Sequence, residues 1–331
     1  MGSGTWSTTQ YEQDALDRSQ RGQSTFSYSD QVRTRPASQQ KAHNAMNVFG
    51  VQHRESCDSA EHPNSVAIAV HFDVTGSMGE IPMTLQTRMS DLFGLILRKG
   101  YVADPQIMFG GIGDHTCDNV PVQIGQFESD NRTDESLRDI YLEGGGGGQG
   151  TESYELAMYF MARHTKIDCL NKRGHKGYLF LVADELPHGT VSKAAVATYF
   201  GDKLEKDIPL ETIVRELMEM YEVYILFPSS GSGYSDDTSH HNAWKKLFPE
   251  RFVMFNPEDI CEVIVSIIGK REGTFDAPEI LAHLKELGTS AKSLMSISQV
   301  LETVTPGASA SIASAQLPGL SGKKSSGTRR L

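Results

Sequence analysis

The chain has 331 residues, a formal net charge of -11 and a pI of about 5.5. Such an acidic chain would repel a nucleic-acid backbone unless its basic residues were gathered in one patch, and no stretch approaches the ~20 apolar residues of a membrane span. The four cysteines lie far apart without a Cys-x-x-Cys pair, so they fit neither a short-spaced zinc site nor a dense disulfide framework. The N-terminus has no apolar signal core. We therefore expect a cytoplasmic protein with reduced cysteines.

Residues 1–62 are polar and carry only scattered aromatic side chains, such as Trp6, Tyr11 and Phe26. Serine, threonine, glutamine and arginine dominate this region, and a segment of this composition buries too little apolar surface to fold by itself. We predict a flexible N-terminal arm.

An apolar run over residues 66–72 predicts the first buried strand, and it ends abruptly in Asp73, Thr75, Gly76 and Ser77. Apolar residues at helical spacing follow from Ile81 onward, which predicts a helix. In a parallel sheet, a turn between a strand and a helix is a common ligand site. One carboxylate and two hydroxyls on a tight turn suit a hard divalent cation, and glycine lets the backbone pass close to it.

Residues 106–113 read as the second strand, which is closed by Asp114 and His115. A short loop that holds Asp118 leads to a third strand over residues 121–127. This connection is too short for a helical crossover, so we expect the third strand to be antiparallel at the sheet edge.

A helix over about residues 134–142 leads into a loop with six glycines between positions 144 and 150. So many glycines favour a binding loop over a linker, because they permit unusual backbone angles and close approach. We expect Gly147, Gly148 and Gly150 to shape the site together with Gly76. The loop lacks the Gly-Lys-Ser/Thr ending of a P-loop. A further helix is predicted from Thr151 to about residue 164.

A continuous apolar run over residues 177–183 predicts another parallel strand, which ends in Asp184 and Glu185. His240 and His241 are interpreted as a solvated helix start. The remaining predictions are helices over 191–200, 213–221, 242–248 and 260–268, and strands over 223–227 and 251–255. Two weaker helical patterns fall within residues 273–305, and the Ser, Ala and Gly content from residue 306 to 331 predicts a disordered tail.

Together these elements predict an α/β fold: a doubly wound, mostly parallel six-stranded sheet with one antiparallel edge strand and flexible extensions at both ends. The turn from Asp73 to Ser77 resembles the first motif, Asp-x-Ser/Thr-x-Ser, of the metal-ion-dependent adhesion site (MIDAS) of von Willebrand factor A (VWA) domains. The resemblance covers roughly residues 64–270 and implies a VWA-like domain at 63–272. It also implies a hydroxyl ligand from the glycine-rich loop and an aspartate after the fourth strand, which would be Asp184.

For the loop ligand, Thr151, Glu152 and Ser153 compete, and spacing does not choose between them. The resemblance implies Mg²⁺, with Mn²⁺ or Ca²⁺ as alternatives. Thr75 and Ser77 would touch the ion, and Asp73 and Asp184 would hold it directly or through water. The hydroxyl of Thr151 or Ser153 would add to this set. A partner protein's acidic side chain would then complete the shell.

Additional carboxylates at Asp114, Asp118, Glu152 and Glu185 would surround this metal. They would tighten metal binding, reduce the attraction for an external acid, and leave open a second cation. The chain looks like the cytoplasmic VWA proteins of bacteria and phages, some of which work beside MoxR-type AAA+ ATPases. The resemblance therefore implies a protein-interaction module rather than an enzyme, with no membrane or nucleic-acid partner.

Two rival interpretations stay open. The same turn resembles the Asp-Lys-Thr-Gly-Thr turn of haloacid-dehalogenase-type phosphotransferases, in which Asp73 would be the nucleophile and Asp184 with Glu185 would hold Mg²⁺. No second Asp or Lys follows Asp73 within the turn, which speaks against it. A metal-independent structural or RNA-associated scaffold is the other alternative, and the acidic charge speaks against RNA binding.

Overall fold

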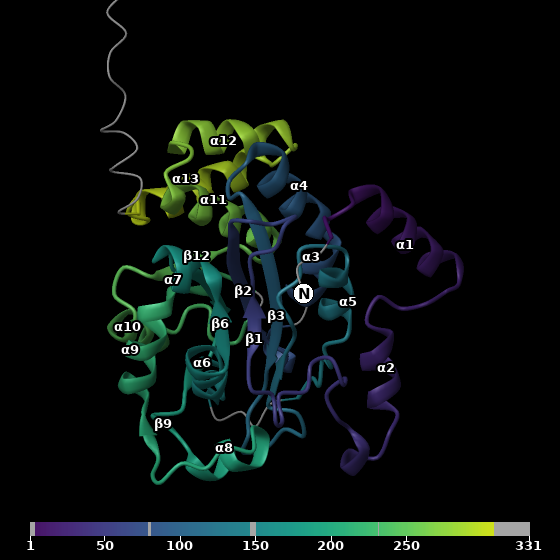
Figure 1. Cartoon of the computed structure of the whole chain (residues 1–331), viewed down its shortest axis with the longest axis vertical. Coiled ribbons are helices and arrows are strands. Elements are labelled where there is room, and N and C mark those ends of the chain that lie inside the picture. The colour runs from purple at the N-terminus through teal and green to yellow at the C-terminus, as the bar shows by residue number, and fades with distance from the viewer. Residues whose placement is uncertain (1–3, 79–80, 146–149, 231, 308–331) are drawn as a thin grey trace, which may run out of the picture.

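A six-stranded sheet forms the centre of the molecule in a computed structural model that describes residues 4–78, 81–145, 150–230 and 232–307 (Figure 1). In spatial order the strands are β12 (Phe252–Phe255), β11 (Tyr221–Pro228), β7 (Gly177–Val182), β2 (Ser65–Asp73), β3 (Asp104–Ile112) and β4 (Val122–Ile124). Neighbouring strands are parallel except at the edge, where β4 runs antiparallel to β3. The predicted mostly parallel sheet and its antiparallel edge strand are confirmed.

The central strand β2 is buried along its whole length, and its side chains alternate between two cores. Ile68, Val70 and Phe72 belong to one core, whereas Ala67 and Ala69 face the other. Successive strand residues point to opposite faces of a sheet, so a strand with helices on both sides must be apolar at every position. This explains why the sequence here is a continuous apolar run.

Helices cover both faces of the sheet. The first core is closed by α3 (Ile81–Thr87), α4 (Met89–Lys99) and α11 (Ile260–Glu272), and the second by α6 (Tyr154–Arg163), α8 (Lys193–Tyr199), α9 (Leu210–Met220) and α10 (Thr238–Leu247). Gly100 ends α4 in the left-handed region: this residue has φ 67°, and its N–H is donated to the carbonyl of Ile96.

Shorter elements connect and support the sheet. They are α5 (Arg132–Arg138), α7 (Asp168–Arg173), the 3₁₀ turns η1 (Ala37–Gln39), η2 (Gly76–Met78) and η3 (Pro257–Asp259), and the paired strands β1 (Arg54–Ser56) with β6 (Thr165–Ile167), β5 (Thr151–Glu152) with β8 (Leu186–Pro187), and β9 (Thr190–Val191) with β10 (Ile208–Pro209). The pair β5–β8 corrects one prediction. Thr151 does not begin a helix, because its backbone pairs with Leu186 and α6 starts only at Tyr154.

The N-terminal segment is helical and packed on the domain, so the predicted flexible arm is wrong for the described residues from 4 onward. It forms α1 (Thr8–Gln20) and α2 (Ser27–Arg33), which Figure 1 shows on the outside, near α3 and α5. Trp6 stacks on Phe93 with ring centroids 4.4 Å apart, and Tyr11 donates a hydrogen bond to the carbonyl of Gln86. These aromatic residues complete the core of the domain and do not form a separate core. Their positions therefore do not recur at helical spacing in the sequence.

The two helical patterns after residue 273 form α12 (Ala277–Glu286) and α13 (Ala291–Thr303), and Figure 1 shows both beside α11. Ile280, Leu284, Ile297 and Leu301 are buried in the first core. Asp276 and Glu279 form a reciprocal capping box that satisfies the first N–H groups of α12. The predicted disordered tail lies mostly outside the described residues, which end at 307.

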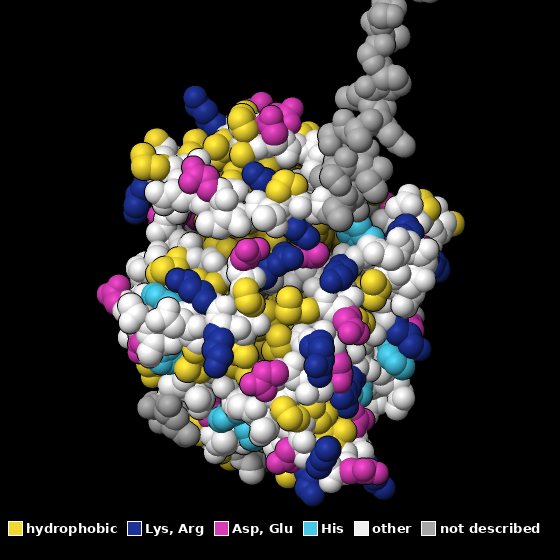
Figure 2. Space-filling view, turned by 90° about the vertical axis from the view of Figure 1, so that its left-hand side faces the viewer, with side chains coloured by type: hydrophobic (Ala, Val, Ile, Leu, Met, Phe, Trp, Pro, Cys, Tyr) yellow, Lys and Arg dark blue, Asp and Glu magenta, His cyan; other side chains and the backbone are white. Residues whose placement is uncertain are grey.

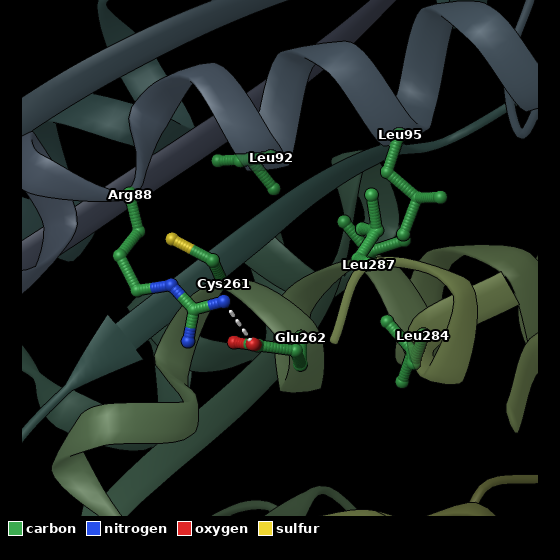
Figure 3. A pocket seen from close by; sticks show the side chains of 8 residues that line it. Arg88, Leu92, Leu95, Cys261, Glu262, Leu284 and Leu287 are labelled. Carbon is green, nitrogen blue, oxygen red and sulfur yellow. Dashed lines mark ion pairs between the residues drawn. The ribbon is translucent and has the colours of Figure 1, made fainter. Parts of the chain in front are cut away.

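An ion pair joins the partly exposed Arg88, which lies between α3 and α4, to the buried Glu262 on α11 (Figure 3). Figure 3 shows the guanidinium pointing at this carboxylate, and it also donates a hydrogen bond to the carbonyl of Glu258. Apolar side chains from α4 and from α12 and its C-cap line the same pocket: Leu92, Leu95, Leu284 and Leu287. The ion pair therefore holds the junction between α3 and α4 against α11.

His240 and His241 are buried rather than solvated, which overturns the interpretation of this stretch as an exposed helix start. The helix α10 begins earlier than predicted because the Asp237 carboxylate accepts the N–H of Ser239. The ring of His240 lies 4.6 Å from that of Tyr234, and the ring of His241 packs edge-on against Phe227. Both histidines are thus held by aromatic packing.

The surface that includes α9 and α10 carries mixed charges (Figure 2). Figure 2 shows Lys and Arg side chains interspersed with Asp, Glu and hydrophobic side chains, without a continuous basic patch on this face. Within the described ranges, no helix is both long and apolar enough to cross a membrane.

Candidate metal centre

Two aspartates meet where the neighbouring parallel strands β2 and β7 end. Asp73 is the last residue of β2, and Asp184 follows β7 by two residues. Because the two strands pair in parallel register, their carboxyl ends open at the same edge of the sheet. Both side chains are fully buried, and the negative charge of Asp184 is one of the influences that raise the pKa of Asp73. The structure thus brings these two predicted residues together.

Asp73 is held in place by two hydrogen bonds. Its Oδ1 accepts the backbone N–H of Thr75 at 2.6 Å, which closes the turn, and its Oδ2 accepts the hydroxyl of Tyr154 at 3.1 Å. Tyr154 is buried at the start of α6 and packs edge-on against Trp244. No sequence pattern marks Tyr154 for this contact, since a tyrosine in an apolar helical pattern gives no sign of a polar partner.

The glycine-rich loop lies directly beside the turn. The N–H of Gly76 is donated to the carbonyl of Gly145, and the N–H of Gly144 to the carbonyl of Val74. A Cβ at position 76 would come within 3.2 Å of the Gly145 carbonyl oxygen, so the close approach predicted for Gly76 is present. Gly150 has φ 73°, which a glycine adopts without strain. Gly147 and Gly148 lie outside the described residues, and so does the Ser77 side chain.

Glu152 is the loop residue that joins the acidic cluster. Burial, followed by repulsion from Asp73 and Glu185, raises its pKa to about 10. Its Oε2 is buried and finds no hydrogen-bond partner in the residues that the structure describes, and its carboxyl shares a hydrogen bond with Glu185. Burial, followed by the charge of Asp184, also raises the pKa of Glu185. Each acid thus makes ionisation of its neighbours harder.

The other two loop candidates lie differently. Thr151 is half-buried in β5, and its backbone pairs with Leu186. Ser153 is fully buried, and its Oγ accepts the N–H of His115 at 2.9 Å and lies 2.8 Å from that residue's Nδ1. Its hydroxyl is therefore engaged by His115, next to Asp114, and not by the cluster around Asp73.

Asp114 and Asp118 form a hydrogen-bonded turn after β3. The Oδ2 of Asp118 accepts the N–H of Asp114 at 2.6 Å, and burial raises the pKa of Asp118. Asp114 turns its own Oδ1 towards His188, whose Nε2 lies 2.9 Å away. Both aspartates contribute negative potential at Glu152. They are neighbours of the acidic cluster, as predicted from the direction of β3.

Asp184 has one free oxygen. Its Oδ2 accepts the hydroxyl of Ser232 at 2.8 Å, whereas its Oδ1 is buried and has no hydrogen-bond partner among the described residues. Among the described residues, no Lys or Arg forms an ion pair with Asp73, Glu152, Asp184 or Glu185. Buried carboxylates need a counter-charge or a proton. A divalent cation bound by these oxygens would supply the charge, and its binding would release protons.

A hollow of about 220 Å³ opens beside the turn. It is lined by Arg33, Asp73, Val74, Thr75, Gly76, Met78, Pro82, Leu142 and Gly144. Arg33 comes from α2 and is held by hydrogen bonds from its guanidinium to the carbonyl of Leu142. The N-terminal segment therefore places a cationic side chain at the rim of the candidate centre, a position that no pattern in the sequence indicates.

Neither the models of known protein families nor the sequences of curated proteins match this chain. Among solved structures, the pilus adhesin SpaC from Lactobacillus rhamnosus GG, in its open conformation, aligns over 62% of this chain and 30% of its own, with 12% identity and a TM-score of 0.43. Proximal thread matrix protein 1 from the mussel byssus aligns over 76% of this chain and 72% of its own, with 10% identity and a TM-score of 0.39. This chain thus spans about a third of the adhesin. Both likenesses are too remote to carry an argument about function.

Proposed function

We propose that this chain is a Mg²⁺-dependent protein-binding module whose metal centre lies at the carboxyl ends of β2 and β7. The observation that carries the proposal is the group of four buried carboxyl groups, two of which keep an unpartnered oxygen, beside an open hollow. The resemblance of the turn from Asp73 to Ser77 to the MIDAS motif supports the same assignment.

Magnesium suits this set of donors because it prefers oxygen ligands, demands near-octahedral geometry and keeps waters where the protein offers no oxygen. Asp73 and Asp184 would supply the charge, directly or through water, and Thr75 and Ser77 would supply hydroxyls. Glu152 would remain protonated and donate to Glu185, since burial and its acidic neighbours raise its pKa to about 10. The centre would then contain more carboxyl groups than the resemblance implies.

An acidic side chain of a partner would bind by displacing a water from the ion. Two ionised aspartates neutralise the charge of Mg²⁺, so the ion alone attracts an external acid weakly. Arg33 at the rim of the hollow would add the missing attraction, because a guanidinium can hold a carboxylate through two hydrogen bonds. We therefore propose that the metal and Arg33 recognise the same acidic side chain. A MoxR-type AAA+ ATPase is the partner class that the resemblance implies.

A phosphotransferase is the second candidate for the same residues, and the environment of Asp73 speaks against it. Asp73 is fully buried, and both of its oxygens accept hydrogen bonds, from Thr75 and Tyr154. A nucleophile must present one oxygen to a phosphoryl group. We therefore propose binding without catalysis. Beryllofluoride trapped on Asp73 would instead favour the enzyme.

The direct test combines metal binding with partner capture. Immobilised protein should retain a partner, with a MoxR-type ATPase as the first candidate, when Mg²⁺ is present, and should release it with a chelator. Asp73→Ala should abolish this capture while leaving the melting temperature of the metal-free protein nearly unchanged. Asp207→Ala, at an exposed residue outside the site, is the matched control and should bind normally. Capture that survives in Asp73→Ala, or is indifferent to chelator, would contradict the proposal.

A further inference from the structure

A second cluster of metal-binding side chains lies beside the acidic one. Asp114 and His115 follow β3, and His188 lies in the turn between β8 and β9. One ligand atom from each of these three residues lies within 4.8 Å of the other two. The cluster combines imidazole nitrogens with a carboxylate, which distinguishes it from the all-oxygen cluster around Asp73.

The separations in this second cluster are close to those around a tetrahedral metal. Asp114 Oδ1 lies 2.9 Å from His188 Nε2 and 3.6 Å from His115 Nδ1. Two ligands of a tetrahedral zinc ion, each bound at about 2.0–2.1 Å, are roughly 3.4 Å apart. Small side-chain rotations would therefore let these atoms surround one ion.

Glu155 supplies an independent sign that the cluster awaits a ligand. Its side chain is fully buried in the first turn of α6, and within the described part of the chain its Oε1 has no hydrogen-bond partner. That oxygen points into the cluster, 3.9 Å from His115 Nδ1, whereas Oε2 accepts the N–H of His188 at 3.2 Å. A buried carboxylate oxygen without a donor is costly, and a cation would satisfy it.

The surrounding groups hold the donors in position. Asp114 accepts hydrogen bonds from the N–H and the hydroxyl of Thr116, at 3.0 and 2.6 Å. Ser153 Oγ accepts the N–H of His115 and lies against the Nδ1 of the same residue. A metal at Nδ1 would need the hydroxyl hydrogen of Ser153 to turn away, while the backbone bond could remain. Such supporting contacts orient the ligands of many metal sites.

We propose that Asp114, His115, His188 and Glu155 bind a transition-metal dication of the zinc class, separately from Mg²⁺ at Asp73. Imidazole suits zinc and its neighbours among the transition metals, whereas Mg²⁺ selects oxygen ligands. Two carboxylates and two neutral imidazoles would balance the charge of one dication. The site is an addition to the proposed binding function and does not depend on it.

The test is a titration of the metal-stripped protein with Co²⁺ in the presence of excess Mg²⁺, which occupies the all-oxygen centre. We expect one equivalent of Co²⁺ to bind, with the intense visible absorption of tetrahedral cobalt, and one equivalent of Zn²⁺ to displace it. His115→Gln and His188→Gln should each weaken Zn²⁺ binding by more than about tenfold, since even loss of a supporting contact costs about 10–100-fold. Glu155→Gln should weaken it as well.

His53→Gln is the matched control, because this histidine lies away from the cluster in the segment before β1. It should bind Co²⁺ as the unaltered chain does. Asp73→Ala should lose Mg²⁺-dependent capture but keep the cobalt spectrum, so the two sites can fail separately. Absence of the spectrum in the unaltered chain, or a spectrum unchanged in both histidine variants, would overturn the proposal.

Discussion

Two regions of this molecule bury carboxyl groups, and they differ in how the negative charge is balanced. On α11, Glu262 is buried against Arg88, which the chain itself provides. At the carboxyl ends of β2 and β7, Asp73, Glu152, Asp184 and Glu185 are buried together, and among the described residues no Lys or Arg forms an ion pair with them. Both regions pay the cost of removing charge from water, but only the first receives a cation from the fold.

The comparison separates an acid that is paired within the fold from a group of acids that we propose to bind a cation. Burial raises the pKa of Glu262, and the charge of Arg88 opposes that rise. Burial also raises the pKa of Asp73, but there the charge of Asp184 raises it further. A group of acids that repel one another destabilises the metal-free fold unless protons or a bound cation offset the negative charge. The difference between the two regions therefore predicts where added cations act.

Breaking the internal pair should have the largest effect on stability. Arg88→Met should lower the free energy of unfolding by about 3 kcal/mol, because it leaves Glu262 buried without a partner. The measurement is denaturant unfolding at neutral pH. In the double variant Arg88→Met/Glu262→Leu, most of this loss should be recovered; a double variant as unstable as the single one would show that packing, not charge, is what Arg88 contributes.

Adding Mg²⁺ should change the free energy of unfolding by nearly as much as Arg88→Met does, but in the opposite direction. At a free Mg²⁺ concentration about a hundredfold above its dissociation constant, the free energy of unfolding should rise by about 2.7 kcal/mol. Thermal melts with Mg²⁺ and with chelator measure this difference. Arg88→Met should keep the gain, whereas Asp73→Asn should lose it. A gain retained in Asp73→Asn would place the bound metal elsewhere.

The metal-free protein should lose stability as the pH rises. Because the pKa of Glu152 is about 10 in the folded state and about 4.3 in the unfolded chain, the folded state holds the extra proton between these values. Its contribution is complete below the lower value and declines through this window by about 1.4 kcal/mol per pH unit, or roughly 2.7 kcal/mol between about pH 6 and about pH 8. Glu152→Gln should flatten the profile of unfolding free energy against pH. An unchanged slope would mean that Glu152 is not the group responsible.

Removing the positive charge of Arg33 at the rim of the hollow should have the smallest effect, and it should act on partner binding. Arg33→Gln should weaken partner capture about two- to fivefold, since an exposed charge contributes about 0.2–1 kcal/mol, and it should leave the Mg²⁺ affinity unchanged. The loss should shrink at high salt. Surface plasmon resonance at two salt concentrations measures both effects. The control is Arg35→Gln, at an exposed residue of the same segment that does not line the hollow. Equal losses in the two variants would remove Arg33 from the proposed recognition.

Local patterns in the sequence were enough to predict the sheet and its polar edge. Continuous apolar runs such as residues 66–72 and 177–183 have one stable arrangement, as strands covered on both faces, and the acids that end them must then meet at one edge. Asp73 and Asp184 could therefore be paired without coordinates. The short connection after β3 likewise allowed only an antiparallel neighbour.

Only the tertiary structure decided which nearby side chains share a contact, because side-chain direction depends on packing between segments far apart in the chain. Glu152 and Ser153 are adjacent in sequence, yet one joins Asp73 and Glu185 while the other contacts His115. The N-terminal aromatic residues and Arg33 were also invisible to periodicity, since each is held by contacts with the domain rather than by its own neighbours. The strands themselves follow from local hydrophobicity, whereas the membership of the acidic cluster follows from where the loops turn.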